Sequence, residues 1–165
     1  MNARLLPKMM LRGYATKAKK DVVVLGTGWA AARLARDLDL SKHNLVVISP
    51  RNHMVFTPLL ASTTVGTLDF RSVAVSMRNI QPKLYQAPNQ YYTAKATKID
   101  FDKQTVSCKA ESGEFDVSYD ELAIATGAAG STFGIPGVEE HALPLRDVHD
   151  ADAIRNKLMS NICQR

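Results

Sequence analysis

The chain has 165 residues, of which 45% are hydrophobic and 22% charged, and these values are typical of a single soluble globular domain. The net charge is +5, but residues 1–20 contain six Lys or Arg and no Asp or Glu, whereas residues 21–165 contain 15 basic and 16 acidic residues. The basic excess therefore belongs to a tail and gives no reason to expect a nucleic-acid partner. Apolar stretches end well before the roughly 18 residues that a transmembrane helix needs, so none is expected.

The basic tail has the composition of a mitochondrial presequence. Arg4, Lys8 and Arg12 recur every four residues and would form one basic stripe on a helix, with leucine and methionine beside it. Residues 12–16 resemble a matrix processing site, with cleavage expected after Tyr14. The alternative is a basic N-terminus that carries no address.

The first recognisable unit is a strand, a helix and a second strand. Residues 22–25 and 45–48 are short, continuous, mostly β-branched apolar runs, which are typical of buried parallel strands. Residues 29–40 between them have apolar side chains at helical spacing. All three fit within about 30 residues, the size of one right-handed βαβ unit.

A nucleotide-binding fingerprint stands where this helix begins. Gly26-Thr27-Gly28-Trp29-Ala30-Ala31 fits G-x-G-x-x-A. Gly26 permits the tight turn, Gly28 lets a pyrophosphate approach the backbone, and Ala31 allows close packing of the helix on the sheet. Free N–H groups at the helix start favour an anion. The alternative is a glycine-rich turn needed only for packing.

The second strand departs from this fingerprint at its end. An acidic residue that binds the ribose is usual there, whereas this chain has Ser49, followed by Pro50 and Arg51. Serine can still hydrogen-bond a ribose hydroxyl. Arg51 is expected either to contact a phosphate or the adenine, or to be a solvated loop cation.

The later elements are predicted from caps, alternation and turn residues. We expect a loop with a short helix over residues 50–67, a helix over 69–80 capped by Asp69, strands over 91–100, 105–110 and 114–119 with a hairpin turn at Ser112-Gly113, a buried strand over 122–125, a turn at 135–137, and a helix over 148–163. Cys108 and Cys163 have neither metal-ligand nor CxxC spacing, so we expect two free thiols and no metal site.

Residues 49–60 resemble a segment of the mitochondrial type II (alternative) NADH:ubiquinone oxidoreductases, whose pattern is S-P-R-x-x-F-x-F-T-P-L-L, with Met54 at a position where that family often has an aromatic residue. The resemblance extends over residues 20–165 and includes residues 65–67, 119–122 and 132–138. Disulfide reductases and sulfide:quinone reductases match less well, because they use cysteines near the flavin.

The resemblance implies an FAD-binding domain of the α/β class, Rossmann-like, with a parallel sheet and a small antiparallel β-meander. It implies that Thr57-Pro58-Leu59 runs beside the isoalloxazine, that Ala125-Thr126-Gly127 closes over FAD, and that the backbone near Ala96 touches adenine. In that family NADH gives hydride to the flavin, which passes two electrons to ubiquinone. Because the cofactor carries the chemistry, we expect no catalytic side chain, and we interpret His53, His141 and His149 as surface or packing residues.

Family members are much longer, with a second glycine fingerprint for NADH, a Gly-Asp segment that completes the FAD site, and a C-terminal region that meets the inner mitochondrial membrane and quinone. We therefore divide the chain into a presequence and linker (1–20), a partial FAD-binding domain (21–150) and a helix leading to an absent NADH-binding domain (151–165). Three interpretations remain: a fragment, one piece of a split enzyme completed by a second chain, or a degenerate non-catalytic subunit that serves as an interaction module in a mitochondrial assembly. We expect the isolated chain to bind FAD weakly or not at all, and to lack significant NADH:quinone reductase activity.

Overall fold

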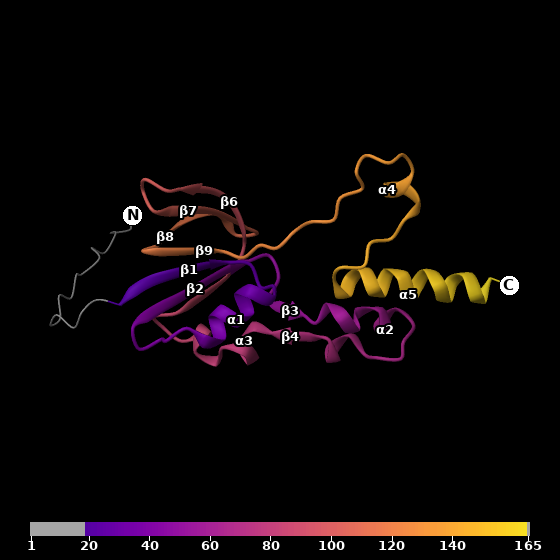
Figure 1. Ribbon diagram of the computed structural model, residues 1–165, viewed down its shortest axis with the longest axis horizontal. Coiled ribbons are helices and arrows are strands. Elements are labelled where there is room, and N and C mark those ends of the chain that lie inside the picture. Colours follow the sequence, from indigo (N-terminus) through magenta and orange to yellow (C-terminus); the bar gives the residue numbers. More distant parts are fainter. Residues whose placement is uncertain (1–18, 165) are drawn as a thin grey trace, which may run out of the picture.

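A four-stranded parallel sheet forms the middle layer of the main body of the computed structural model, which describes residues 19–164 (Figure 1). Its strands are β1 (Lys20–Leu25), β2 (His43–Ser49), β5 (Gln90–Thr93) and β9 (Glu121–Ile124), in the order β5-β2-β1-β9. All three neighbouring pairs are parallel. The predicted presequence lies outside the described residues.

Helix α1 (Trp29–Asp37) makes the predicted crossover from β1 to β2. It is shorter than the expected helix over 29–40, because Leu38 is already extended and Asp39 turns the chain by accepting a hydrogen bond from the Ser41 amide. Ala31, Ala32 and Ala35 are buried, and these small side chains allow α1 to pack closely on the sheet.

The sheet is covered on both faces, which explains why its two central strands are continuously apolar (Figure 1). On one face lie α1, α3 (Met77–Ile80) and the short 3-10 helix η3 (Pro82–Tyr85). On the other face lies the predicted antiparallel meander of β6 (Lys95–Asp100), β7 (Thr105–Ala110) and β8 (Gly113–Ser118). The domain therefore has three layers, with one hydrophobic core on each side of the parallel sheet.

The single strand predicted over residues 91–100 is wrong. The chain instead forms β5 in the parallel sheet and β6 in the meander, and these two strands meet at Ala94, which is buried and donates its amide to the Ser49 carbonyl. Alternation continues through the junction, so the sequence gives no sign that the chain changes layer there.

The helix predicted over residues 69–80 is also wrong. Asp69 does accept a hydrogen bond from the Arg71 amide, but it caps only the 3-10 helix η2 (Phe70–Ser72). Strand β4 (Ala74–Ser76) follows and pairs with β3 (His53–Val55), a strand inside the segment expected to be a loop. The alternating β-branched Val73 and Val75 favour the hairpin over a continuous helix, and Ser76 then caps α3.

The remaining elements form an extension beside the sheet. The segment after β3 contains the 3-10 helix η1 (Thr57–Leu59) and α2 (Leu60–Thr64), and a linker with the short helix α4 (Val138–His141) leads from β9 to α5 (Val148–Cys163). Helix α5 has the predicted bounds and packs on α2 (Figure 1). No helix within residues 19–164 is long and apolar enough to cross a bilayer.

The strand predicted over residues 122–125 forms as β9, but the prediction that it is buried is wrong. It lies at the edge of the sheet, where β1 is its partner among the described strands, and Ile124 is 60% exposed. Cys108 and Cys163 are free thiols, as expected.

Candidate nucleotide-binding site

The glycine loop lies at the carboxyl ends of β1, β2 and β9, where ligands of open parallel α/β sheets bind. Gly26 has a φ of +108°, and an added Cβ would overlap the Ala125 carbonyl oxygen and lie 3.0 Å from its carbon. Only glycine fits this position without strain. The close approach brings Ala125 and Thr126 directly against the loop.

Gly28 is the N-cap of α1, but its role differs from that of Gly26. Its φ of −72° is ordinary, and a Cβ built on it would meet nothing within 4 Å. The first turn of α1 has neither a side-chain cap nor an acidic residue. An open glycine beside uncapped helix N–H groups fits a phosphate group, which would occupy the space that a side chain would fill.

Two cavities border the glycine loop. The larger cavity has a volume of about 740 Å³ and lies beside the start of α1 and the segment that follows β9. Its lining includes Gly28, Trp29, Ala30, Arg51, Val55, Thr57, Ala125, Thr126, Gly127 and Arg146. The smaller, about 230 Å³, lies over the ends of β1 and β2; its lining includes Gly26, Thr27, Ser49, Pro50, Arg51, Lys95, Ala96 and Thr126. Arg51 and Thr126 line both cavities, so the two spaces meet at these residues.

Most of the residues predicted for cofactor binding therefore come together around these cavities. Ala31 lies beneath the loop, fully buried against the sheet, as its packing role requires. Pro58 and Leu59 follow Thr57 in η1 but line neither cavity. The cofactor contacts of the individual residues stay predictions.

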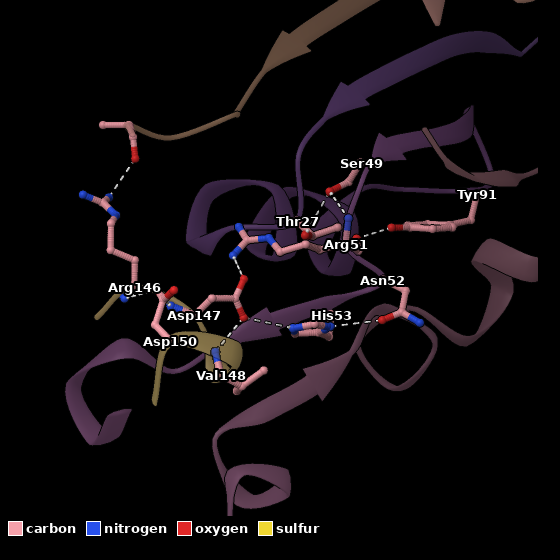
Figure 2. Close-up of polar contacts among 11 residues, drawn as sticks. Thr27, Ser49, Arg51, Asn52, His53, Tyr91, Arg146, Asp147, Val148 and Asp150 are labelled. Carbon is pink, nitrogen blue, oxygen red and sulfur yellow. Dashed lines mark hydrogen bonds and ion pairs between the residues drawn. The ribbon is translucent and has the colours of Figure 1, made fainter. Parts of the chain in front are cut away.

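The side chain of Ser49 is buried, and its hydroxyl is used within the protein. Its Oγ lies 3.2 Å from Thr27 Oγ1 and accepts a hydrogen bond of 3.2 Å from the Arg51 amide (Figure 2). These contacts fix the turn that follows β2. The ribose contact predicted for Ser49 stays a prediction.

Arg51 has a partner that the sequence does not reveal. Its Nη1 lies 2.6 Å from Oδ2 of Asp147, a residue 96 positions away (Figure 2). Asp147 caps α5 by accepting the Val148 amide at 2.7 Å, and Asp150 completes a capping box by accepting the Asp147 amide at 2.9 Å. The capping pattern was readable in the sequence, but nothing local indicated that the cap also pairs with Arg51.

Two neighbours complete this polar cluster. His53 Nε2 lies 3.6 Å from Oδ1 of Asp147, and His53 Nδ1 lies 3.0 Å from the side-chain oxygen of Asn52. Burial raises the pKa of the Asp147 carboxyl, but hydrogen bonds from Arg51 and the Val148 amide outweigh burial and hold that pKa below its usual 3.8. Asp147 is therefore ionised at neutral pH.

Arg146 was also missed from the sequence. Its Nη2 donates to the Ala128 carbonyl at 2.7 Å (Figure 2), and Arg146 lines the larger cavity together with Arg51. Two arginines from distant parts of the chain thus border the space in front of Gly28. Within residues 19–164, no group of three or more His, Cys, Asp or Glu could hold a metal ion.

Comparison with known proteins places this site in a family. Residues 20–164 match the sequence model described as "Pyridine nucleotide-disulphide oxidoreductase". Because the match covers most of the chain, the protein belongs to the pyridine nucleotide-disulphide oxidoreductase family.

Within that family, the resemblance to mitochondrial alternative NADH:ubiquinone oxidoreductases is confirmed. The chain is 51% identical over 159 residues to the internal alternative NAD(P)H-ubiquinone oxidoreductase A1, mitochondrial, of Solanum tuberosum, a match covering 90% of this chain and 32% of that protein. It is 42% identical to the external alternative NADH-ubiquinone oxidoreductase, mitochondrial, of Yarrowia lipolytica, covering 90% of this chain and 26% of that protein.

Solved structures agree with this assignment. NDH2 from Plasmodium falciparum in complex with NADH superimposes with a TM-score of 0.82 at 31% identity, over 90% of this chain and 31% of that one. The sulfide:quinone oxidoreductase from Aquifex aeolicus has a TM-score of 0.73 at 29% identity, over 87% of this chain and 32% of that one. The chain thus spans between a quarter and a third of the length of these relatives.

Proposed function

We propose that residues 19–164 are the FAD-binding portion of a mitochondrial type II NADH:ubiquinone oxidoreductase. The observation that carries this proposal is the pair of cavities that meet at Arg51 and Thr126 on the two sides of the glycine loop. A dinucleotide has a matching form, with a diphosphate between two larger groups. The smaller cavity, beside Ser49 and Ala96, suits the adenosine, and the open backbone at Gly28 suits the diphosphate.

The larger cavity supports a flavin at the other end of that dinucleotide. It has more than three times the volume of the smaller cavity. Thr57 and the segment Ala125-Thr126-Gly127, expected from the resemblance to lie beside the flavin, line the same cavity as Gly28. FAD is therefore our proposed ligand, and NADH and ubiquinone are the proposed substrates of the complete enzyme.

When bound, FAD would supply the hydride acceptance from NADH and the two-electron transfer to ubiquinone. The protein's own part is to bind and orient the cofactor: the glycine loop and the start of α1 face its diphosphate, and Arg51 and Arg146 add positive charge at the larger cavity. No side chain is assigned an acid–base step.

The relatives named above are mitochondrial, and we propose the same location for this protein, with the inner membrane as the site of the complete enzyme. The missing length of the relatives would supply the NADH-binding domain, either on the same polypeptide or on a second chain. We propose no nucleic-acid partner.

One observation also fits the third interpretation, a degenerate non-catalytic subunit that serves as an interaction module. Several large apolar side chains of the linker and α5 are exposed, and Phe133 is 88% exposed. The others are Ile135, Leu143, Leu145, Leu158, Met159 and Ile162. Such a surface favours burial against further polypeptide, whether that polypeptide is the missing part of the enzyme or another subunit.

Reconstitution separates the two candidates. The 165-residue chain, alone and fused to the remaining two thirds of the Solanum tuberosum relative, would be assayed for flavin absorbance and for NADH oxidation with a soluble quinone. The enzyme proposal predicts that the fusion binds FAD and turns over, and that Gly28→Val in the fusion abolishes both. A folded fusion without flavin absorbance would contradict the proposal and favour the interaction module.

A further inference from the structure

The carboxylate of Asp147 joins the rim of the nucleotide cavities to the start of α5. We propose that Asp147 is a positioning residue, which holds the Arg51 guanidinium where the two cavities meet and couples the binding of an adenosine diphosphate group to the docking of α5. The inference rests on the part of the proposed function that assigns a dinucleotide to this site. It does not depend on whether that dinucleotide is FAD or NAD.

Hydrogen bonds hold the backbone of Arg51 in place, whereas its side chain is held by Asp147. Its amide donates to Ser49 Oγ, and its carbonyl accepts the hydroxyl of Tyr91 (Figure 2). The side chain is 42% exposed, and among residues 19–164 its polar partner is Asp147. Without that partner, a long guanidinium side chain would sample many rotamers, and a ligand would have to order it on binding.

Asp147 is itself held from the opposite side. Its side chain is only 18% exposed, one oxygen faces Arg51, and the other lies 3.6 Å from His53 Nε2. The capping box with Asp150 fixes its backbone at the N-terminus of α5. One carboxylate therefore connects the turn after β2, the start of β3 and the first turn of α5.

Few buried side chains hold the rest of α5 against the domain. Ala151 is its buried residue, and it packs in a cluster with Val55, Leu60 and Val73, with the partly buried Val148 beside them. Beyond it, apolar side chains such as Leu158 and Ile162 are exposed. An ordered Arg51 thus stabilises the docked helix, and by linkage a ligand that contacts Arg51 stabilises it further.

If Asp147 acted only as the N-cap of α5, substitutions of Asp147 would have different effects from those expected if it also couples Arg51 to the helix. Asparagine caps helices about as well as aspartate, so Asp147→Asn removes the charge while keeping the cap. Asp152→Asn is the matched control, because it removes the same charge from an exposed position of the same helix, where the Asp152 carboxylate accepts a hydrogen bond from the Asn156 side chain.

The first measurement is hydrogen exchange of α5 in the ligand-free 165-residue chain. Asp147→Asn and Arg51→Met should each lower protection in the first two turns of α5, and the double variant should lower it no further. Equal protection in Asp147→Asn and wild type would overturn the inference, as would additive losses in the double variant.

The second measurement is the affinity for ADP, because FAD and NAD both contain an adenosine diphosphate group. Binding is detected by the fluorescence of Trp29, which is the only tryptophan of the chain and lines the larger cavity. Asp147→Asn should weaken binding about two- to fivefold, the size expected for a partly exposed ion pair, and Asp147→Glu should recover part of this loss. Asp147→Asn should have no effect in the Arg51→Met background, and Asp152→Asn no effect in either.

Unchanged or tighter ADP binding by Asp147→Asn would overturn the inference, as would an equal loss in the Arg51→Met background or a wild-type chain that does not bind ADP. A chain that prefers NAD to FAD would refute the proposed function, but the ADP cycle would still decide the role of Asp147.

Discussion

Gly26 offers the sharpest test of how the glycine loop is built. The change is Gly26→Ala, which adds one methyl group at the junction of β1 and β9. The backbone there has a φ of +108°, and the added Cβ would overlap the carbonyl group of Ala125. Backbone hydrogen bonds tie this position to both neighbouring strands: Gly26 N donates to the Ile48 carbonyl of β2 at 2.8 Å, and Ala125 N, just after β9, donates to the Leu25 carbonyl at 2.9 Å.

The expected cost has two parts. A non-glycine residue at this φ costs about 1–3 kcal/mol. Relieving the overlap requires either the end of β9 or the Gly26 backbone to move, which weakens the Ala125–Leu25 bond, the Gly26–Ile48 bond or both, at about 1 kcal/mol each. The total loss in the free energy of unfolding is therefore about 2–5 kcal/mol.

Gly113→Ala is the matched control. Gly113 has a φ of +133°, but a Cβ there would meet nothing within 4 Å, so only the conformational cost applies. The extra cost of about 1–2 kcal/mol at Gly26 corresponds to a further Tm decrease of about 2–8 °C in a domain of this size, measured by circular dichroism without ligand. Equal Tm decreases for the two variants would refute the packing argument.

Four further predictions follow from the same structure and sequence. Gly28→Val should lower the ligand-free Tm by only about 2–4 °C, because its side chain enters open space and the cost is that of a poorer N-cap, about 1 kcal/mol, but it should abolish the Tm increase produced by FAD. The isolated chain should show no NADH:quinone reductase activity above a no-protein control, even with added FAD, because positioning of NADH requires the missing length; robust turnover would contradict this. Folding lowers the pKa of the Asp147 carboxyl, so the ionised carboxylate contributes fully to stability above about pH 3.8, and this contribution is lost as the pH falls through the lower pKa of the folded state. The free energy of unfolding, measured with urea at pH 7 and pH 3, should therefore change less with pH in Asp147→Asn than in wild type. Equal changes in the two proteins would refute the reasoning. N-terminal sequencing of the native mitochondrial protein should begin at or near Ala15, and an intact Met1 would contradict the presequence interpretation.

Elements with local signals could be predicted from the sequence. The buried runs of β1 and β2, the fingerprint between them and the capped helix α5 each depend on neighbouring residues, and the structure places them as expected. The candidate site followed from them, because the fingerprint fixes where the helix N-terminus and the strand ends meet.

Features that depend on distant partners could not be predicted in this way. Residues 92–96 alternate through the junction, yet Ala94 marks a change of layer that only the packing of the meander determines. Asp69 is a cap in both the prediction and the structure, but the pairing of β3 with β4 overrides the helix expected to follow it. The pair of Arg51 and Asp147 joins residues 96 positions apart, and no local pattern identifies it.

Whether the glycine-loop site takes FAD is tested most directly by ligand-dependent thermal unfolding, which detects weak binding. The wild-type chain and Gly28→Val would be heated with FAD or NAD at the same millimolar concentration. A ligand present at about ten times its Kd adds about 1.4 kcal/mol of stability, equivalent to about 3–6 °C. FAD should raise the Tm of wild type more than NAD does and should leave Gly28→Val unchanged. A Tm increase with NAD and none with FAD, or the same FAD effect in Gly28→Val, would contradict the account.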